Sequence, residues 1–310
     1  MIHPLDILKA TQAAAIACYS YIGMGNEKLA DKAAVDAMRN SFNQLNFSAR
    51  IVIGEGERDQ APMLFIGEEV GANKTSPTQY DIAVDPLEGT TICAHAMPGS
   101  LSVLAITELG GMLHAPDVYM DKIASYIPLE SQVIDIDESI KTNLNNIAKY
   151  KKSNLSDLEV IILDRPRHQE IIAKTREAGA RVKLIGDGDV AAVIAVALKQ
   201  ADLYLGIGGA PEGVLAAAAL KTLGGQMTGR LLFKDESEKA KAHKLGVTDL
   251  NKKYNLNDLV SKDAIFCATG VTSGSLLKGV EKSSNSWTTS SLILNSSTHQ
   301  VLKIEDRKYL

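Results

Sequence analysis

Hydrophobic and polar residues follow two different periods along this chain. Apolar residues that recur every three or four positions predict helices, whereas short alternating or continuous apolar runs predict strands. The predicted helices cover Ile7 to Tyr21, Leu29 to Phe42, Gln169 to Ala178, Val190 to Lys199, Val214 to Leu223 and Ser237 to Leu250. The predicted strands cover Ala49 to Ile53, Tyr80 to Val84, Ser100 to Thr107, Met112 to Ala115, Val160 to Leu163, Arg181 to Ile185, Asp202 to Ile207, Met227 to Phe233 and Asp263 to Ala268, followed by a closing hairpin of Trp287 to Leu294 and Val301 to Asp306. The pattern predicts an α/β protein, in which Ser100 to Thr107 and Met112 to Ala115 form a hairpin.

A polar stretch from Glu130 to Ser156 separates two α/β halves. It is rich in Asn, Lys and Ser, and we interpret it as a surface helix and a connection. The second half starts at Glu159. The chain is therefore predicted to form a single α/β protein over residues 1–310, with two approximate lobes at residues 1–157 and 158–310.

Composition narrows the class of protein. The 310 residues are 45% hydrophobic but only 5% aromatic, which suits a buried sheet covered by helices. A net charge of -4 argues against a nucleic-acid-binding protein, which needs a basic surface to offset phosphates. The N-terminus lacks the pattern of a signal peptide, and no apolar run reaches the roughly 18 residues of a membrane helix, so we expect no membrane partner.

The three cysteines, Cys18, Cys93 and Cys267, lie far apart in the sequence. They show no C-x-x-C spacing, so neither a disulfide framework nor a thiolate metal site is predicted. Reduced, buried thiols fit a cytoplasmic protein.

The strongest candidate chemistry lies in Asp85-Pro86-Leu87-Glu88-Gly89-Thr90. Pro86 cannot donate to a strand ladder, so the strand from Tyr80 is predicted to stop there and a weak helix to follow. Two carboxylates and a hydroxyl then lie on a strand-to-helix turn, where free backbone N–H groups favour anions. Carboxylates beside a bound anion need a cation between them and the anion. A hard divalent metal ion that binds both the carboxylates and a phosphate would meet this need. The alternative is a capped turn whose acids are solvated.

Other acidic residues follow helix starts and strand ends. Candidates for a second metal are Glu55, Glu57 and Asp59, in a glycine-containing acidic loop after the strand Ala49 to Ile53. Asp31 is either a ligand or an acid that complements a helix dipole. Glu212 follows a Gly-rich turn at the end of the strand Asp202 to Ile207. That turn matches neither a dinucleotide fingerprint nor a GKS or GKT phosphate loop.

The second half supplies cations and further polar groups. Arg165 and Arg167 flank Pro166 at a strand end, and arginine matches phosphate with two parallel donors. The alternative is a surface salt-bridge patch. Asp187 and Asp189 either cap the helix that follows or accept hydrogen bonds from sugar hydroxyls. A lone Tyr119 is most simply an amphipathic residue at the edge of the core.

Several of these blocks, taken in order, resemble one family, the class II fructose-1,6-bisphosphatases of the lithium-sensitive, metal-dependent sugar-phosphatase superfamily. The resemblance extends from about Ala14 to about Gly279. Its blocks are Ile51 to Glu57, Asp81 to Thr90, Asp164 to His168, Asp187 to Asp189 and Gly206 to Gly213.

The resemblance implies a layered αβαβα sandwich with two mixed sheets. It implies metal ligands at Asp31, Glu55, Asp85, Glu88 and Glu212. It implies substrate contacts at Glu88, Gly89, Thr90, Tyr119, Arg165, Pro166, Arg167, Asp187, Gly188, Asp189 and Gly209. Two or more Mn²⁺ or Mg²⁺ ions are implied for each site, and a homo-oligomer, either a dimer or a tetramer, is expected.

The chain departs from the family pattern before Asp31. The family usually has Lys-Asn-Thr-Ala-Asp there, whereas this chain has Glu27-Lys28-Leu29-Ala30-Asp31. This change puts metal affinity or rate in question. The C-terminal end is short for the family and does not match its pattern, which bears on oligomer contacts.

The expected function is hydrolysis of the 1-phosphate of fructose 1,6-bisphosphate, a step of gluconeogenesis. Asp85, Glu88 and Glu212 would hold one ion, and Asp31 and Glu55 another. Thr90 would orient the attacking water, Glu57 or Asp59 would act as base, and Arg165 and Arg167 would anchor the 6-phosphate. The alternatives are a related phosphatase for sedoheptulose bisphosphate, inositol phosphate or a nucleotide 3′-phosphate, and a phosphosugar-binding regulator that has lost turnover.

Overall fold

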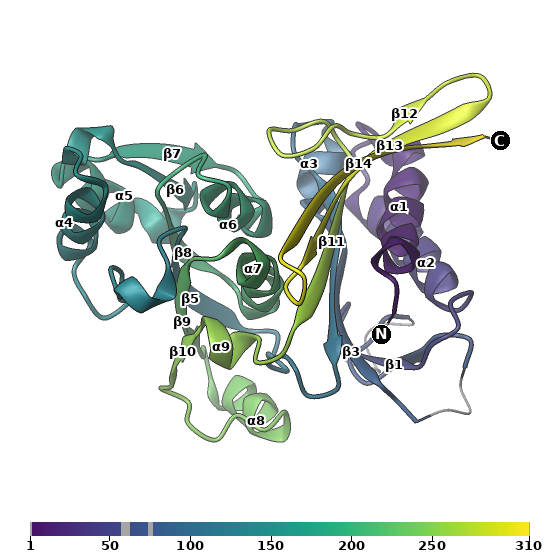
Figure 1. The fold of residues 1–310 in the computed structure, drawn as a ribbon, viewed down its shortest axis with the longest axis horizontal. Coiled ribbons are helices and arrows are strands. Elements are labelled where there is room, and N and C mark those ends of the chain that lie inside the picture. Colours follow the sequence, from purple (N-terminus) through teal and green to yellow (C-terminus); the bar gives the residue numbers. More distant parts are fainter. Residues whose placement is uncertain (1, 57–62, 74–76, 310) are drawn as a thin grey trace. The chain divides into compact units, whose positions relative to one another are not determined.

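The chain folds into two compact units. A computed structural model describes residues 2–56, 63–73 and 77–309. Unit 1 combines Met1–Met112 with Lys262–Leu310, and unit 2 is Leu113–Ser261. This division differs from the predicted lobes at residues 1–157 and 158–310, because the C-terminal strands pair with strands of the first hundred residues. Both units are mixed sheets that carry helices, so the α/β prediction is confirmed (Figure 1).

Unit 1 contains the N-terminal helices and the C-terminal hairpin. Its elements are α1 (Pro4–Cys18), the 3-10 helix η1 (Tyr19–Tyr21), α2 (Glu27–Phe42), β1 (Ala49–Ile53), β2 (Glu69–Val70), β3 (Tyr80–Glu88), α3 (Thr90–Ala94), β4 (Leu101–Glu108), β11 (Ala264–Gly270), β12 (Glu281–Lys282), β13 (Ser286–Asn295) and β14 (Gln300–Tyr309).

The sheet of unit 1 has eight strands within the described residues. Its order is β12-β13-β11-β4-β3-β1-β2, with β14 paired to β13. Strands β1 and β3 run parallel, whereas β3, β4, β11 and β13 alternate in direction. Helices α1 and α2 pack together, and α1 lies against β3, β4, β11 and β13. Small residues such as Ala10, Ala14 and Ala34 are fully buried, which allows the helices to approach closely.

Unit 2 contains the middle of the chain. Its elements are β5 (Tyr119–Ser125), η2 (Leu129–Ser131), α4 (Ile140–Lys151), η3 (Leu155–Asp157), β6 (Glu159–Leu163), η4 (Pro166–His168), α5 (Gln169–Glu177), β7 (Arg181–Ile185), α6 (Asp189–Ala197), β8 (Leu203–Gly209), α7 (Ala210–Leu223), β9 (Gln226–Leu232), α8 (Glu236–Lys244), β10 (Lys253–Asn255) and α9 (Leu256–Leu259).

The sheet of unit 2 has the order β10-β9-β5-β8-β6-β7. Helices cover both of its faces. On one face, Leu203 and Leu205 of β8 share a core with Leu144 of α4 and Ile172 of α5. On the other face, Tyr204 contacts α6, because successive side chains of a strand point to opposite sides.

One predicted hairpin is wrong. Residues 112–115 form no strand beside β4; instead, the partners of β4 are β3 and β11, which are distant in sequence. The next strand is β5, which belongs to the other sheet. The closing hairpin is confirmed, because β13 and β14 pair antiparallel from Ser286↔Tyr309 to Asn295↔Gln300.

Two further findings concern the cysteines and the helices. Cys18, Cys93 and Cys267 are buried and form no disulfide. No helix in the described part of the chain is long and apolar enough to span a membrane.

Candidate active site

Three carboxylates of unit 1 lie within electrostatic reach of one another. Asp31 is on α2, Glu55 follows β1, and Asp85 is in β3. Strands β1 and β3 are parallel, and Ile53 pairs with Ala83. Glu55 lies two residues after Ile53, and Asp85 lies two residues after Ala83. The structure therefore brings Glu55 and Asp85 to the same end of the sheet.

Burial and mutual repulsion raise the pKa values of these acids. Burial, followed by repulsion from Asp31 and Asp85, raises the pKa of Glu55 to about 8. Burial, followed by repulsion from Asp85, raises the pKa of Asp31 to about 6. A raised carboxyl pKa means that the folded protein holds protons more tightly than the unfolded chain, so ionisation costs stability as the pH rises through that range. A bound cation would offset this cost.

The donor set fits a hard divalent cation. All three side chains offer carboxylate oxygens, which Mg²⁺ and Mn²⁺ prefer. Within the described residues, no group of three or more His, Cys, Asp and Glu side chains converges closely enough to hold an ion by itself. Glu57 and Asp59, the predicted bases, lie outside the described residues.

The segment from Asp85 to Thr90 corrects one prediction. Strand β3 does not stop at Pro86 but continues to Glu88. The pairing with β4 passes from Asp85↔Val103 to Glu88↔Leu101. The chain therefore advances three residues along β3 but only two along β4, which makes a bulge. Pro86 lies in this bulge, where a missing N–H donor is tolerated.

The bulge and the turn after it fix the backbone of the acidic segment. The Leu87 N–H donates to Oδ1 of Asp85 at 3.1 Å, and the hydroxyl of Ser100 donates to the carbonyl of Glu88 at 2.9 Å. Gly89 has a φ of 77°, which a residue with a side chain rarely adopts. Thr90 then begins α3, which places its hydroxyl directly after the acidic turn.

The segment that departs from the family pattern has a structural role. The hydroxyl of Thr91 donates to Oε1 of Glu27 at 2.7 Å, which ties α3 to the start of α2. Asn26 caps α2 by accepting from the N–H of Leu29 at 3.1 Å. Leu29 itself is 48% exposed. This contact of Glu27 is absent from the sequence-based predictions.

In unit 2, the Gly-rich turn between β8 and α7 is closely packed. Glu212 lies in the first turn of α7, and a Cβ on Gly209 would collide with its carboxylate. A Cβ on Gly208 would collide with Asp189 and the ammonium of Lys122. Because neither glycine has a side chain, the carboxylates of Asp189 and Glu212 can pack directly against the backbone.

A buried ion pair holds this turn. Lys122 of β5 is 1% exposed and pairs with Oδ2 of Asp189. Its ammonium also donates to the carbonyl of Gly209 at 2.8 Å, and the hydroxyl of Tyr204 donates to Asp189 at 3.4 Å. Asp189 was predicted to contact substrate or to cap α6. Its carboxylate contacts Lys122 and Tyr204, and the expected contact with substrate stays a prediction. The cap position of α6 is Gly188, which has a φ of 88°, so Asp189 does not cap the helix.

Cations and an aromatic ring lie together at another part of unit 2. Arg167 donates through Nε and Nη2 to the carbonyl of Ile207 at 3.0 and 2.9 Å. Its guanidinium carbon lies 4.9 Å from the ring centroid of Tyr119, and Nζ of Lys234 lies 4.9 Å from the same centroid. Tyr119 is 37% exposed and is contacted by two cations, so it is not a core residue.

His168 fixes the segment that carries the arginines. Its Nε2 accepts from the Ile207 N–H at 2.8 Å, so the proton is on Nδ1, which donates to the Leu163 carbonyl at 2.8 Å. Burial lowers the pKa of His168 and keeps the ring neutral. The β6 end that carries Arg165 and Pro166 is thereby joined to β8. Asp187 lies on the following strand exit, where its Oδ1 accepts from the N–H of Gly188 at 3.0 Å.

Residues 3–308 match the family described as bacterial fructose-1,6-bisphosphatase, glpX-encoded. The chain belongs to this family. The family is one of metal-dependent phosphatases.

Curated relatives of this bisphosphatase family agree over nearly the whole chain. The "D-fructose 1,6-bisphosphatase class 2/sedoheptulose 1,7-bisphosphatase" of Thermosynechococcus vestitus is 42% identical over 94% of this chain and 91% of its own length. The protein of the same name from Synechococcus elongatus is 42% identical over 94% and 92%.

Solved structures show a weaker likeness. The extragenic suppressor protein SuhB of Bartonella henselae is 14% identical, with a TM-score of 0.38 over 64% of this chain and 74% of that one. An inositol monophosphatase from Anabaena is 17% identical, with a TM-score of 0.35 over 64% and 73%.

Two residues of this bisphosphatase-family chain were missed by sequence reasoning. Lys122 lies in a strand that is otherwise largely buried, and a single lysine in such a strand is the signal that could have revealed it. Lys234 follows β9 by two residues, and no sequence pattern pairs it with Tyr119. Both contacts join segments more than 60 residues apart.

Proposed function

We propose that this chain hydrolyses the 1-phosphate of fructose 1,6-bisphosphate, giving fructose 6-phosphate and inorganic phosphate with the help of divalent metal ions. The observation that carries the proposal is the family match over residues 3–308. The crowded carboxylates of unit 1 support the metal requirement. The direct test is phosphate release from this substrate by the purified chain, with and without a divalent metal.

The carboxylates of unit 1 are proposed to bind the metal. Asp31, Glu55 and Asp85 repel one another, and Glu88 follows Asp85 across the bulge. Glu212 is a further proposed ligand. When bound, a divalent cation supplies positive charge that stabilises the phosphoryl transition state and makes water more acidic. Mn²⁺ and Mg²⁺ both suit carboxylate oxygens.

The remaining groups of the acidic segment are proposed to position the reactants. The hydroxyl of Thr90 orients the attacking water, and the backbone of Gly89 and Thr90 contacts the phosphate. The water oxygen forms a bond to phosphorus as the bond from phosphorus to the sugar oxygen breaks. The proton of the water passes to a carboxylate, and the departing sugar oxygen takes a proton from solvent. Glu57 or Asp59 is the proposed base.

The cationic residues of unit 2 are proposed to bind phosphate. Arg165 and Arg167 offer guanidinium groups, and Lys234 and Tyr119 complete the cluster around Arg167. Asp187, Gly188 and Gly209 remain proposed sugar contacts. Asp189 is also a proposed sugar contact, and we propose that Lys122, which pairs with its carboxylate, positions it.

Sedoheptulose 1,7-bisphosphate is the second candidate substrate, since the two curated relatives carry both activities in their names. We further propose a dimer or tetramer located in the cytoplasm.

Replacing Arg167 with Ala should lower kcat/KM for fructose 1,6-bisphosphate by about 30-fold to 160-fold, the loss expected for a charge-assisted phosphate contact of about 2 to 3 kcal/mol. Hydrolysis of fructose 1-phosphate, which lacks the second phosphate, should fall far less. Initial rates with both substrates provide the measurement.

Arg176→Ala is the matched control, because Arg176 is an exposed arginine of the nearby helix α5. It should change neither rate by more than about twofold. Equal losses with both substrates for Arg167→Ala would mean that Arg167 serves only to hold the Ile207 carbonyl.

A further inference from the structure

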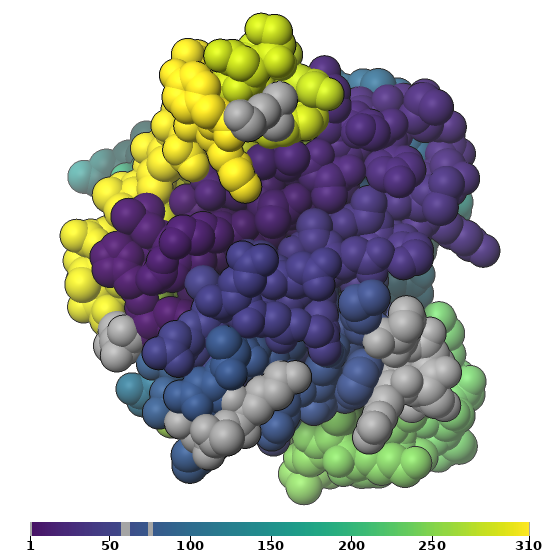
Figure 2. Space-filling model, turned by 90° about the vertical axis from the view of Figure 1, so that its right-hand side faces the viewer, coloured from purple at the N-terminus to yellow at the C-terminus, as the bar shows by residue number. Residues whose placement is uncertain are grey.

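A pocket separate from the acidic cluster lies within unit 1. Its volume is about 620 Å³, and it is bounded by α1, α2 and the β13–β14 hairpin. Figure 2 shows the hairpin, in yellow, on the same face of the molecule as the purple N-terminal helices. This volume is within the range typical of sites for small molecules.

The helical walls of the pocket follow from residue spacing. Lys9, Gln12, Ala13 and Ile16 recur at intervals of three and four residues on α1, so they share one face. Residues 37, 40, 41 and 44 repeat the same spacing on α2 and just beyond it. Alanines at positions 13 and 37 keep the space open, and their polar neighbours supply hydrogen-bonding groups.

The charge of the pocket is positive. Asp306 is its one acidic lining residue, and its Oδ2 accepts from Nε2 of Gln12 at 3.3 Å. The same nitrogen donates to Thr289 at 3.2 Å. Lys9 pairs with Asp6 at 2.8 Å, whereas Lys308 of β14 forms no ion pair within the described residues. Its ammonium is therefore available to an anion.

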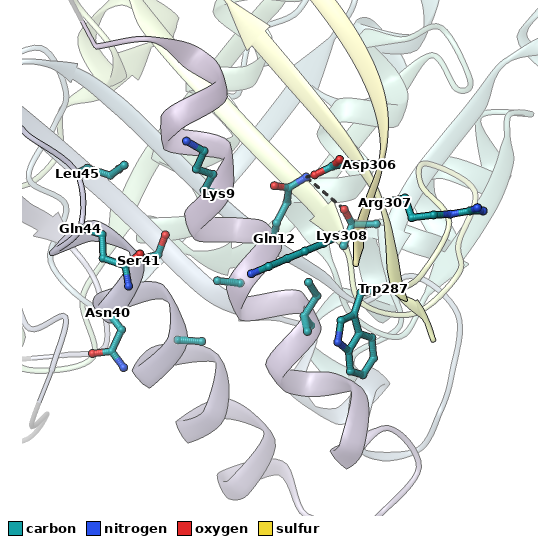
Figure 3. A pocket seen from close by; sticks show the side chains of 14 residues that line it. Lys9, Gln12, Asn40, Ser41, Gln44, Leu45, Trp287, Asp306, Arg307 and Lys308 are labelled. Atoms are coloured by element: carbon teal, nitrogen blue, oxygen red, sulfur yellow. Dashed lines mark hydrogen bonds between the residues drawn. The ribbon is translucent and has the colours of Figure 1, made fainter. Parts of the chain in front are cut away.

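Lysines of β14 lie on opposite sides of the strand. Asp306 and Lys308 share a face of the strand, since side chains alternate, and Asp306 contacts α1. Figure 3 shows Lys308 extending toward the helices. Lys303 is exposed, lies on the other face by the same alternation and does not line the pocket, so it is a matched control for Lys308.

We propose that this pocket binds a small organic phosphate. Lys308 and Lys9 supply positive charge for the phosphate, and the amides of Asn40 and Gln44 with the hydroxyl of Ser41 supply partners for polar groups of the ligand. The occupant contacts the C-terminal half of α2, the helix that carries Asp31 near its start. The site is independent of the proposed hydrolysis.

The sequence provides a reporter for this pocket. Trp287 is the single tryptophan of the chain and lines the pocket. Its ring is held by Tyr19, with centroids 5.1 Å apart, and by Lys282 at 4.9 Å. A ligand that changes its surroundings should therefore change the intrinsic tryptophan fluorescence.

The experiment is a fluorescence titration of the full chain with glycerol 3-phosphate and with inorganic phosphate, in the presence of a chelator. We expect a saturable signal with both, and none with uncharged glycerol. Lys308→Gln should weaken binding by about fivefold or more through the lost ammonium, whereas Lys303→Gln should change it by less than about twofold. Because the chelator removes divalent ions, failure of the metal site cannot produce or abolish the signal.

Three results would overturn the proposal. The first is the lack of a saturable signal. The second is an equal loss of affinity in the Lys308 and Lys303 variants. The third is a change in sedimentation of the Lys308 variant without a change in phosphate binding, which would assign the pocket to contact between copies of this chain.

Discussion

Replacing Asp85 with Asn should reduce metal-dependent phosphate release by about 10³-fold or more, because it removes one negative charge from the proposed metal ligands. Asn has nearly the same shape as Asp, and its side-chain oxygen can still accept from the Leu87 N–H, which is 3.1 Å away in the unaltered chain. The fold should therefore persist. The loss should appear in kcat with saturating metal.

A second readout of this variant does not depend on turnover. Repulsion from Asp85 contributes to the raised pKa values of Asp31 and Glu55, so both pKa values should fall when that charge is removed. Titration of the carboxyl groups by NMR, in metal-free protein, measures the change. Calorimetry of Mn²⁺ binding should show weaker affinity in the same variant.

Asp36→Asn is the matched control for Asp85→Asn. Asp36 lies on α2, as Asp31 does, but it is only partly buried and pairs with Lys32 at 2.7 Å. Its replacement should leave activity and metal affinity within about twofold of the unaltered chain. An Asp85 variant with normal turnover and normal metal binding would rule out the metal role of this residue.

Replacing Lys122 with Met should destabilise unit 2 by about 3 to 5 kcal/mol, because the Asp189 carboxylate would remain buried without its counter-charge. The Gly209 carbonyl would also lose its donor. Urea unfolding followed by circular dichroism measures the loss, and amide exchange in β5 and β8 locates it. Trp287 lies in unit 1 and cannot report on this change.

Two comparisons isolate the ion pair. Adding Asp189→Asn to Lys122→Met removes the uncompensated charge, so the double variant should recover part of the lost stability. Lys151→Met breaks the pair with Asp202, in which the lysine is 26% exposed, and should cost less. If the double variant were no more stable than Lys122→Met, the buried charge would not be the cause.

Local sequence patterns predicted most elements of the fold. The bounds of β1 match the predicted strand Ala49 to Ile53, because an apolar run there is bounded by polar and glycine residues. The helix at Leu29 to Phe42 begins two residues earlier, where Asn26 provides the cap. These features depend on near neighbours in sequence, which is why the sequence alone determined them well.

Long-range pairing could not be read from local pattern. Residues 112–115 have the composition of a strand, but β11 takes the place beside β4 that a hairpin would occupy. The border of the units was missed for the same reason, since β11 to β14 join the sheet of the N-terminal half. Proline cannot donate a hydrogen bond to a neighbouring strand, and Pro86 was therefore predicted to end the strand. The strand continues instead, because Pro86 lies in a bulge where that donor is not needed.

In the candidate site, too, local patterns identified residues but not their long-range contacts. Sequence reasoning found acids and arginines at strand ends, since parallel strands that end together gather their exits at one edge. It did not find the partners of these residues: Lys122 for Asp189, Lys234 for Tyr119, and Thr91 for Glu27. These contacts depend on how separate strands and helices pack, which no motif specifies.

The most direct test of the account is phosphate release by the purified chain from fructose 1,6-bisphosphate, with sedoheptulose 1,7-bisphosphate and inositol 1-phosphate for comparison, in Mn²⁺, in Mg²⁺ or in chelator. We predict release of one phosphate from fructose 1,6-bisphosphate, with fructose 6-phosphate as the other product, loss of activity in chelator, and recovery when metal is restored. Undiminished release in chelator, or binding of the bisphosphate without release in either metal, would contradict the account.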